Sequence, residues 1–445
     1  MPDLKVNFAG IESPNPLWLA SAPPTNCGYQ VMRAFDAGWG GVVWKTLAVP
    51  VINVSSRYGA VNYRDTRMAG FNNIELVSDR PVSDNLREIE QVKKYFPKHA
   101  IIASMMFGPR EEWHQAVIDA QNAGADGLEL NFGCPHGMNE RGMGSAVGQN
   151  PKALATITSW VMEKAKVPVI VKLTPNITDI TEAAMAAQEG GADAISLINT
   201  IQSLVGIDLD TFAPLPIVDG MGTNGGYCGP AVKPIALNMV KNCAQHKDFK
   251  LPISGIGGVE NWRDAVEFML VGARTVQVCT AVMHYGFGII REILSGLEQF
   301  MRDRGFASVD DFIGKALPNI TTWENLNLNY RIIAQIERDR CIGCQLCYTA
   351  CEDGAHQAIG LADDPDDRVP FIKDENCVGC NLCALVCPVE GCITMKRTDE
   401  GTNKETWKQR MAAGTIPETF DDSRAGGLAH HVPDPAEALG KPKQS

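Results

Sequence analysis

The chain has 445 residues, of which 45% are hydrophobic and 21% charged, and its 52 acidic residues exceed its 40 Lys and Arg residues by 12. At about 150 residues per domain this length predicts more than one domain, and the composition excludes disorder, collagen and a coiled coil as whole-chain structures. The acidic balance argues against binding to nucleic-acid backbones, and the absence of a secretion signal or of an apolar run near the about 20 residues that span a bilayer predicts a cytoplasmic location.

Residues 1–305 contain a recurring unit in which an Ala-rich amphipathic stretch ends in Gly and a β-branched apolar segment follows at once. The Gly suits a helix C-cap, and a continuous apolar segment is typical of a strand buried on both faces. With the other apolar runs the pattern predicts eight strands, at 17–22, 41–46, 101–106, 127–131, 168–174, 194–199, 252–257 and 276–281. Helices are expected between them, at 29–37, 111–123, 151–166, 178–189, 231–244 and 260–271.

Eight strands that alternate with helices favour an α/β fold of the (β/α)₈ or TIM-barrel type, with a doubly wound open sheet as the alternative. In such a barrel the active site gathers at the C-terminal ends of the strands. Nearly every expected strand here ends in a polar or glycine residue: Ser21, Lys45, Thr46, Ser104, Asn131, Lys172, Asn199, Thr200, Gly257, Gly258, Cys279 and Thr280. Capping and turn formation could explain each one singly, but their recurrence at this edge predicts a site.

After the barrel, residues 306–335 are expected to form a linker and residues 336–397 a separate cysteine-rich domain. This domain repeats the spacing C-x2-C-x2-C-x3-C, and Pro388 follows the second run. In two-cluster ferredoxins the fourth cysteine of each run ligates the other cluster. The spacing therefore predicts a ferredoxin-like domain with two [4Fe-4S] clusters. One would be held by Cys341, Cys344, Cys347 and Cys387, and the other by Cys377, Cys380, Cys383 and Cys351.

Structural zinc sites are the alternative for these cysteines, since C-x2-C pairs also bind zinc. The ninth cysteine of the domain, Cys392, is interpreted as a small buried hydrophobe. Residues 398–445 are rich in Gly, Pro, Thr and Asp and are expected to form a polar tail, either packed on a neighbour or disordered.

Two such clusters carry single electrons, so a flavin is expected nearby to convert them into a hydride. Flavin mononucleotide (FMN) suits the strand ends, because phosphate sites in these barrels follow strands 7 and 8, where Gly257 and Thr280 lie, with Gly229 in the preceding loop. Lys45 and Lys172 could place positive charge near the N1–C2 edge of the flavin. The alternative for both lysines is a salt bridge at a strand end.

A glycine-rich loop, residues 131–148, follows the fourth strand and is expected to act as a mobile lid. Cys134 lies at its hinge, and an ordinary thiol is protonated at neutral pH, so Cys134 is predicted to be a general acid. The alternatives are a buried structural Cys134 and an exposed His136. A match to the dinucleotide fingerprint at residues 220–225 is interpreted as accidental, because no βαβ unit surrounds it.

Together these residues resemble a known family, the catalytic subunits of two-subunit NAD-dependent dihydropyrimidine dehydrogenases, whose barrel is related to that of dihydroorotate dehydrogenases. The resemblance covers residues 1–397. The motifs that carry it are Asn72-Asn73-Ile-Glu-Leu, Asn131-Phe-Gly-Cys134-Pro-His-Gly-Met, Lys172-Leu-Thr-Pro-Asn, Asn199-Thr200, Gln277-Val-Cys279-Thr280 and both ferredoxin runs. The long single-chain members carry Ser before the cysteine, where Gly133 stands here.

The resemblance implies that Cys134 is the proton donor and that the pyrimidine is held by Asn73, Asn131, Asn199 and Thr200. It implies FMN contacts from Ser21, Lys45, Thr46, Lys172, Gly229, Gly257, Gly258, Cys279 and Thr280. A partner subunit bearing FAD would oxidise NADH and send electrons through the clusters to FMN. Hydride would then reach C6 of uracil or thymine while Cys134 protonates C5. A dihydroorotate dehydrogenase-like enzyme and a non-catalytic electron-transfer subunit are the alternatives.

Overall fold

The computed structural model describes residues 2–49, 51, 53–364, 366–398 and 403–415. The chain divides into two compact units, Met1–Asn319 and Ile320–Ser445. Among the described residues, no helix is both long and apolar enough to cross a bilayer.

The first unit is built around a closed barrel of eight parallel strands, which confirms the predicted fold class and excludes the open sheet. In chain order the strands are β3 (Leu17–Leu19), β4 (Gly41–Leu47), β7 (Ala100–Met105), β8 (Gly127–Asn131), β9 (Val169–Lys172), β10 (Ala194–Leu197), β13 (Ile253–Ile256) and β14 (Ala273–Val278). Each strand pairs with the next one along this series, and β14 closes the barrel against β3. Their side chains are almost all buried, as expected for strands covered on both faces.

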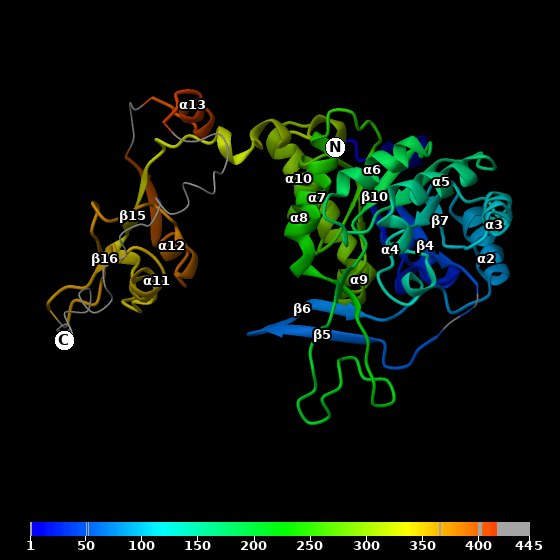
Figure 1. Ribbon diagram of the computed structural model, residues 1–445, viewed down its shortest axis with the longest axis horizontal. Coiled ribbons are helices and arrows are strands. Elements are labelled where there is room, and N and C mark those ends of the chain that lie inside the picture. Colours follow the sequence, from blue (N-terminus) through cyan, green and yellow to red (C-terminus); the bar gives the residue numbers. More distant parts are fainter. Residues whose placement is uncertain (1, 50, 52, 365, 399–402, 416–445) are drawn as a thin grey trace. The chain divides into compact units, whose positions relative to one another are not determined.

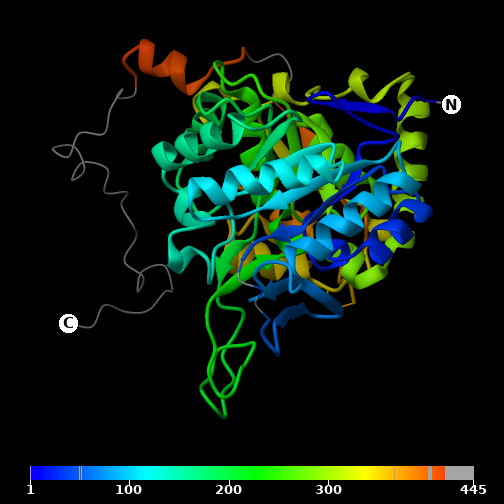
Figure 2. The same cartoon turned by 90° about the vertical axis from the view of Figure 1, so that its right-hand side faces the viewer.

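Helices form the outer layer around these strands (Figures 1 and 2). They are α1 (Gly28–Ala37), α2 (Val82–Tyr95), α3 (Arg110–Asn122), α5 (Pro151–Met162), α6 (Ile180–Glu189), α7 (Lys233–Gln245), α8 (Trp262–Leu270) and α10 (Ile290–Arg304), with the shorter α4 (Ser145–Gly148) and α9 (Thr280–Tyr285) in loops. The helices α2 and α10 were not predicted from the sequence. The last strand was expected at 276–281 and exists, but its bounds were wrong: β14 covers Ala273–Val278, and Cys279 is already the N-cap of α9.

A second sheet, which the sequence analysis did not predict, lies at one end of the barrel (Figure 1). It is antiparallel with the order β11-β12-β6-β5, from β5 (Tyr58–Tyr63), β6 (Thr66–Asn73), β11 (Ile201–Ser203) and β12 (Gly225–Cys228). Its strands come from the loops after β4 and β10, so it belongs to the C-terminal end of the barrel. The fingerprint-like segment 220–225 leads into antiparallel β12 and not into a dinucleotide-binding helix.

The opposite end of the barrel is closed by an N-terminal hairpin of β1 (Val6–Phe8) and β2 (Ile11–Ser13). Phe8 and Ile11 of this hairpin pack in a small buried cluster with Trp18, Val43, Ala100, Ile102, Ile170 and Ala194. Apolar side chains therefore fill the N-terminal end of the barrel. The polar residues at the C-terminal ends of the strands lie at the other, open end.

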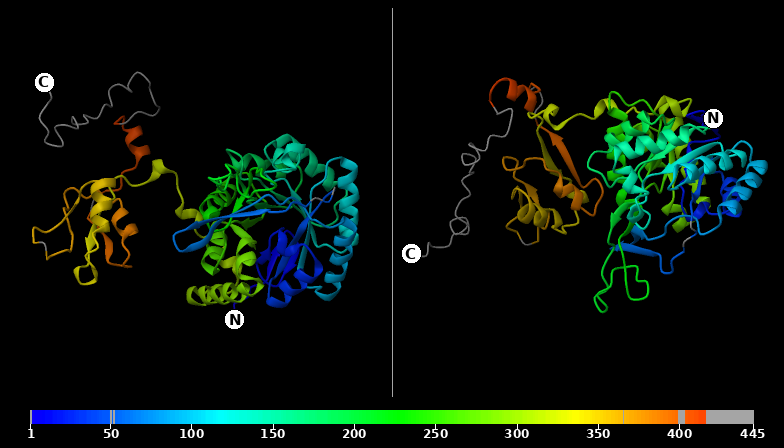
Figure 3. Two further views of the ribbon diagram at one scale, coloured as in Figure 1. Left: turned by 90° about the horizontal axis from the view of Figure 1, so that it is seen from below. Right: turned by 45° about the vertical axis from the view of Figure 1, so that its right-hand side comes forward.

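The second unit contains two short antiparallel sheets and, next to its cysteine runs, two helices. β15 (Ile332–Ile336) pairs with β18 (Ile393–Arg397), and β16 (Ile359–Gly360) pairs with β17 (Phe371–Ile372). α11 (Leu346–Gly354) and α12 (Leu382–Val386) lie side by side (Figure 3). β15 thus begins inside the stretch that the sequence analysis assigned to a linker. In the expected polar tail, α13 (Trp407–Ala412) is helical, and residues 416–445 lie outside the described part.

Candidate active site

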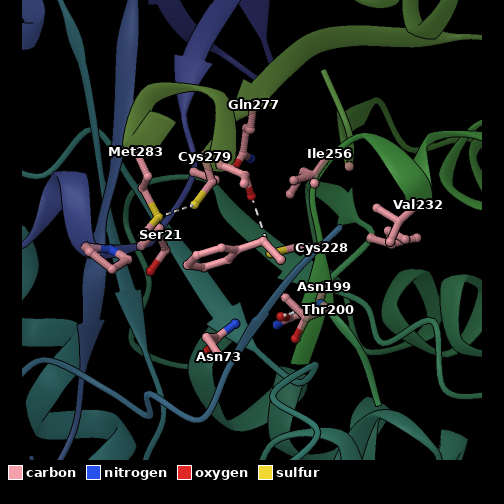
Figure 4. Close-up of a pocket in the computed structure, with 18 of the residues that line it drawn as sticks. Ser21, Asn73, Asn199, Thr200, Cys228, Val232, Ile256, Gln277, Cys279 and Met283 are labelled. Atoms are coloured by element: carbon pink, nitrogen blue, oxygen red, sulfur yellow. Dashed lines mark hydrogen bonds between the residues drawn. The ribbon is translucent and has the colours of Figure 1, made fainter. Parts of the chain in front are cut away.

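A cavity of the first unit lies at the C-terminal ends of the barrel strands, where the fold predicts an active site. It measures about 1060 Å³ including its part open to solvent. All the residues that the sequence analysis assigned to pyrimidine, FMN and proton transfer line it: Ser21, Lys45, Thr46, Asn73, Asn131, Cys134, Lys172, Asn199, Thr200, Gly229, Gly257, Gly258, Cys279 and Thr280. In the view of Figure 4, Asn73, Asn199 and Thr200 gather on one side and Cys279 on the other.

Hydrogen bonds between neighbouring strand ends hold the amide and hydroxyl side chains in place. Asn199 Nδ2 donates to Asn131 Oδ1 at 2.9 Å, and Asn131 Nδ2 donates to Thr46 Oγ1 at 3.0 Å. Thr46 also lies 3.1 Å from Ser21 Oγ and 3.0 Å from the buried Ser104 Oγ. This continuous network fixes the polar wall of the pocket, as a binding site for a planar polar ligand requires.

Both predicted lysines line the pocket, and both also form ion pairs. Lys45 Nζ lies 3.2 Å from Glu75 Oε2, and Lys172 Nζ lies 3.8 Å from Oε1 of the fully buried Glu129. The two interpretations of these lysines therefore both hold: each lysine forms a salt bridge, and each also lines the pocket. Glu129 Oε2 accepts hydrogen bonds from Ser196 at 2.8 Å and from Gln277 at 3.5 Å.

Cys134 is buried, with 6% of its surface exposed, in a small apolar cluster that includes Ala48, Val77, Met106 and Met138. Burial raises the pKa of its thiol, although Lys45 and Lys172 act in the opposite direction. The thiol is therefore protonated at neutral pH. Its Sγ donates to the carbonyl oxygen of His136 at 3.5 Å.

His136 is buried and not exposed, which excludes the alternative of an exposed loop residue. Its Nε2 lies 3.0 Å from the carbonyl oxygen of Glu75, and its buried Nδ1 has no hydrogen-bond partner. Desolvation lowers the pKa of this imidazole, so it is neutral at neutral pH. The expected lid role of residues 131–148 stays a prediction.

At the other end of the pocket three glycines leave room for an anion close to the backbone. Gly229 and Gly258 have φ angles of +88° and +74°. A Cβ on Gly258 would lie 2.8 Å from the Cβ of Lys233, and one on Gly257 would lie 2.9 Å from the Cβ of Ala236. Only glycine suits these positions, so the cradle fits the phosphate of FMN.

Several other residues that line the pocket were not predicted from the sequence. They are Tyr58, Phe71, Glu75, Tyr227, Cys228, Glu260 and Gln277, among others. Gln277 Oε1 is buried without a hydrogen-bond partner, so it leaves an acceptor for a ligand amide. Gln277 and Glu75 belong to motifs that carry the family resemblance, and those motifs could have indicated them. Tyr58, Phe71, Tyr227 and Cys228 come from the second sheet, whose strands were not predicted.

In the second unit the cysteines line two separate hollows in the predicted crossed arrangement. One hollow is lined by Cys341, Cys344, Cys347 and Cys387, and the other by Cys377, Cys380, Cys383 and Cys351. Backbone N–H groups donate to thiol sulfurs, from Gly343 to Cys341 at 3.5 Å and from Ala358 to Cys351 at 3.3 Å. Such donors stabilise the negative charge of a cluster. Cys392 is buried as expected, and it also lines the first hollow.

The barrel with its polar mouth, joined to a domain with crossed cysteine runs, defines an oxidoreductase linked to an iron–sulfur electron-transfer domain. Comparison with known protein families agrees with this class. The dihydroorotate dehydrogenase family model matches residues 3–301, and the 4Fe-4S dicluster domain model matches residues 334–395. The chain belongs to the dihydroorotate dehydrogenase family, which is FMN-dependent, and carries a C-terminal 4Fe-4S dicluster domain.

Among curated relatives, the NAD-dependent dihydropyrimidine dehydrogenase subunit PreA of Escherichia coli is 42% identical over 88% of this chain and 95% of its own. The chloroplastic dihydropyrimidine dehydrogenase (NADP(+)) of Arabidopsis thaliana is 44% identical over 73% of this chain and 79% of its own. The catalytic subunit of dihydroorotate dehydrogenase B of Thermococcus kodakarensis is 37% identical over 71% of this chain and 98% of its own. The chain therefore resembles enzymes with two different pyrimidine substrates.

Proposed function

We propose that the chain is the catalytic subunit of an NAD-dependent dihydropyrimidine dehydrogenase, which reduces the 5,6 double bond of uracil or thymine. The observation that carries the proposal is the buried Cys134 thiol in a pocket lined by Asn73, Asn131 and Asn199. The likeness to dihydropyrimidine dehydrogenases extends over the iron–sulfur domain, whereas the Thermococcus relative covers a smaller share of the chain.

Amide side chains suit a pyrimidine base because uracil and thymine alternate N–H donors with C=O acceptors, and Asn offers both. In the proposal Asn73, Asn131, Asn199 and Thr200 hold the base. The Asn199-to-Asn131 hydrogen bond fixes the direction of two of these amides before the base arrives. Such preorganisation would hold the base in one orientation, which proton transfer from Cys134 to C5 requires.

FMN would occupy the rest of the pocket, with its phosphate at Gly229, Gly257, Gly258 and Thr280 and its pyrimidine edge near Lys45 and Lys172. When bound, FMN supplies a hydride to C6 of the base, and the two [4Fe-4S] clusters supply single electrons. Cys134 holds the proton that C5 needs, because burial keeps its thiol protonated. Lys45 and Lys172 would supply positive charge beside the flavin, which favours its anionic reduced form.

A partner subunit that binds FAD and NADH is part of this proposal. The sequence carries no nicotinamide-binding signature, since the only match, at residues 220–225, leads into an antiparallel strand. The word "subunit" in the name of the Escherichia coli relative supports a hetero-oligomer. A cytoplasmic location, expected from the sequence, belongs to the same proposal.

The experiment that tests the proposal is anaerobic reoxidation of the purified chain after reduction with dithionite. Uracil should restore the absorbance of oxidised flavin and yield dihydrouracil. Reoxidation by orotate and not by uracil would favour the second candidate, a dihydroorotate dehydrogenase, which the 37% identity to the Thermococcus subunit keeps open. Reoxidation by neither base would indicate an electron-transfer subunit.

A further inference from the structure

The carboxylate of Glu75 lies in the wall of the pocket, two residues after Asn73, and is held from several sides. Its Oε2 lies 3.2 Å from Lys45 Nζ and accepts a hydrogen bond from Tyr58 Oη at 3.1 Å. Its Oε1 lies 3.0 Å from Arg57 Nη1. The carbonyl oxygen of Glu75 lies 3.0 Å from His136 Nε2, so the backbone is fixed as well. The Glu75 side chain therefore cannot rotate away from the pocket without breaking its contacts with Lys45, Arg57 and Tyr58.

The cations around the pocket are already engaged. Among the described residues that line it, Lys45 and Lys172 are the only Lys or Arg side chains. Lys45 is paired with Glu75, and Lys172 faces the buried Glu129 at 3.8 Å. Arg57 lines the adjoining hollow, whose wall Glu75 and His136 share with the pocket. A ligand with its own carboxylate would meet no uncommitted cation here and would have to compete with Glu75.

We propose that Glu75 is a specificity-determining residue that excludes pyrimidines carrying a carboxylate and thereby restricts the pocket to neutral bases. The proposal rests on the proposed function and deepens it, since the family includes enzymes for both kinds of base. The physical reason is that Glu75 both repels an incoming carboxylate and occupies the cations that such a group would need. A neutral base experiences neither effect.

The first test uses the unmodified, FMN-loaded chain and three probes: uracil, orotate and uracil-6-carboxamide. The amide matches orotate in size and shape but carries no charge. Titrations are followed by the perturbation of flavin absorbance, which reports binding without turnover. The amide is expected to bind at least about 10²-fold more tightly than orotate. Equal affinities for the acid and the amide would mean that size and not charge excludes orotate, and would overturn the proposal.

The second test uses Glu75→Gln, which removes the charge, keeps the shape and can still accept the Tyr58 hydrogen bond. The ratio of the orotate Kd to the uracil Kd should fall by about 10² or more, because the repelling charge is gone and Lys45 becomes available to the orotate carboxylate. Asp79→Asn is the matched control, since Asp79 faces Arg57 at 4.0 Å but does not line the pocket, and this variant should keep the wild-type ratio.

The outcomes separate this inference from the proposed function. A Glu75→Gln variant that binds FMN and uracil but shows an unchanged Kd ratio would overturn the inference alone. A wild-type chain that binds orotate as tightly as uracil would do the same. Failure of dithionite-reduced wild-type chain to be reoxidised by uracil would overturn the proposed function, whatever the binding ratios are. If Glu75→Gln does not retain FMN, the comparison of acid and amide on the unmodified chain decides.

Discussion

At the scale of single residues, Cys134 is the group whose loss should affect chemistry without affecting cofactor content. Its side chain lines the pocket, while the cysteines that would bind iron lie in the other unit. Cys134→Ala should lower uracil turnover by roughly 10² or more, the usual effect of losing a general acid. Flavin and iron contents should stay at the wild-type level. Cys27→Ala, at a half-buried position that does not line the pocket, is the control, and unchanged turnover in Cys134→Ala would remove this thiol from the mechanism.

The burial of Cys134 also predicts the pH dependence of its reactivity. Because burial raises its pKa, the thiolate forms only at a pH above the ordinary thiol range. Alkylation by iodoacetamide at this residue, measured by mass spectrometry of its peptide, should therefore have a midpoint above the about 8.5 of a free thiol. Low accessibility lowers the rate at every pH but does not move the midpoint. A midpoint near that of free cysteine would mean that the thiol is not held in its protonated form.

At the scale of elements, the loop after β13 should tolerate no side chain at Gly258. Its φ of +74° disfavours L residues, and a Cβ would lie 2.8 Å from the Cβ of Lys233 and 2.9 Å from the carbonyl oxygen of Gly229. Gly258→Ala should weaken FMN binding by about 10- to 100-fold, since strain of this kind costs about 1–3 kcal/mol. Gly286→Ala is the control, because Gly286 has a φ of +80° but nothing within 4 Å of an added Cβ. Equal FMN affinity in the two variants would contradict the proposed phosphate site.

The character of each element explains whether it could be predicted from the sequence. Buried parallel strands leave continuous apolar runs, so all eight barrel strands were found, and the residues after them could be assigned to one mouth because parallel strands end at the same edge. The helix α2 was missed although Leu86, Ile89 and Val92 have helical spacing, because its apolar stripe is narrow among charged residues. The second sheet could not be found in this way, since β12 contains two glycines and β11 spans only three residues.

The same limit applies to the site. Residues that follow barrel strands were predicted, but Tyr58 lies on β5 and Glu75 follows β6. These two strands form a hairpin, and β6 also pairs with β12, which comes from a distant part of the chain. Their role depends on the ion pairs with Lys45 and Arg57, which no local pattern encodes. Charge partners across long sequence separations are therefore the part of this site that only the folded chain reveals.

At the scale of the whole molecule, the division into a catalytic barrel and an iron–sulfur unit predicts how the chain uses reductants. The chain alone should turn over uracil with dithionite as the electron source but show negligible NADH oxidation with uracil. The reason is that the proposed nicotinamide site belongs to a partner subunit. Stopped-flow or steady-state assays at 340 nm measure this, with the NADH-binding partner added as the positive arm. NADH oxidation by the isolated chain at the full rate would remove the partner from the proposal.

The crossed cysteine arrangement of the second unit predicts which cluster is lost when a single cysteine is replaced. Cys387 is the fourth cysteine of the second run but lines the hollow of the first, and Cys351 is the fourth cysteine of the first run but lines the hollow of the second. Cys387→Ser should therefore disable the cluster of Cys341, Cys344 and Cys347, and Cys351→Ser the cluster of Cys377, Cys380 and Cys383. Each variant should lose about half of its iron, and the two should retain clusters with different electron paramagnetic resonance spectra.

Cys392→Ala, which changes a fifth cysteine in the first hollow, should keep both clusters, because Cys392 is not part of either set of four ligands. Loss of iron in Cys392→Ala equal to that in Cys387→Ser would show that the ligands of the first cluster are assigned wrongly.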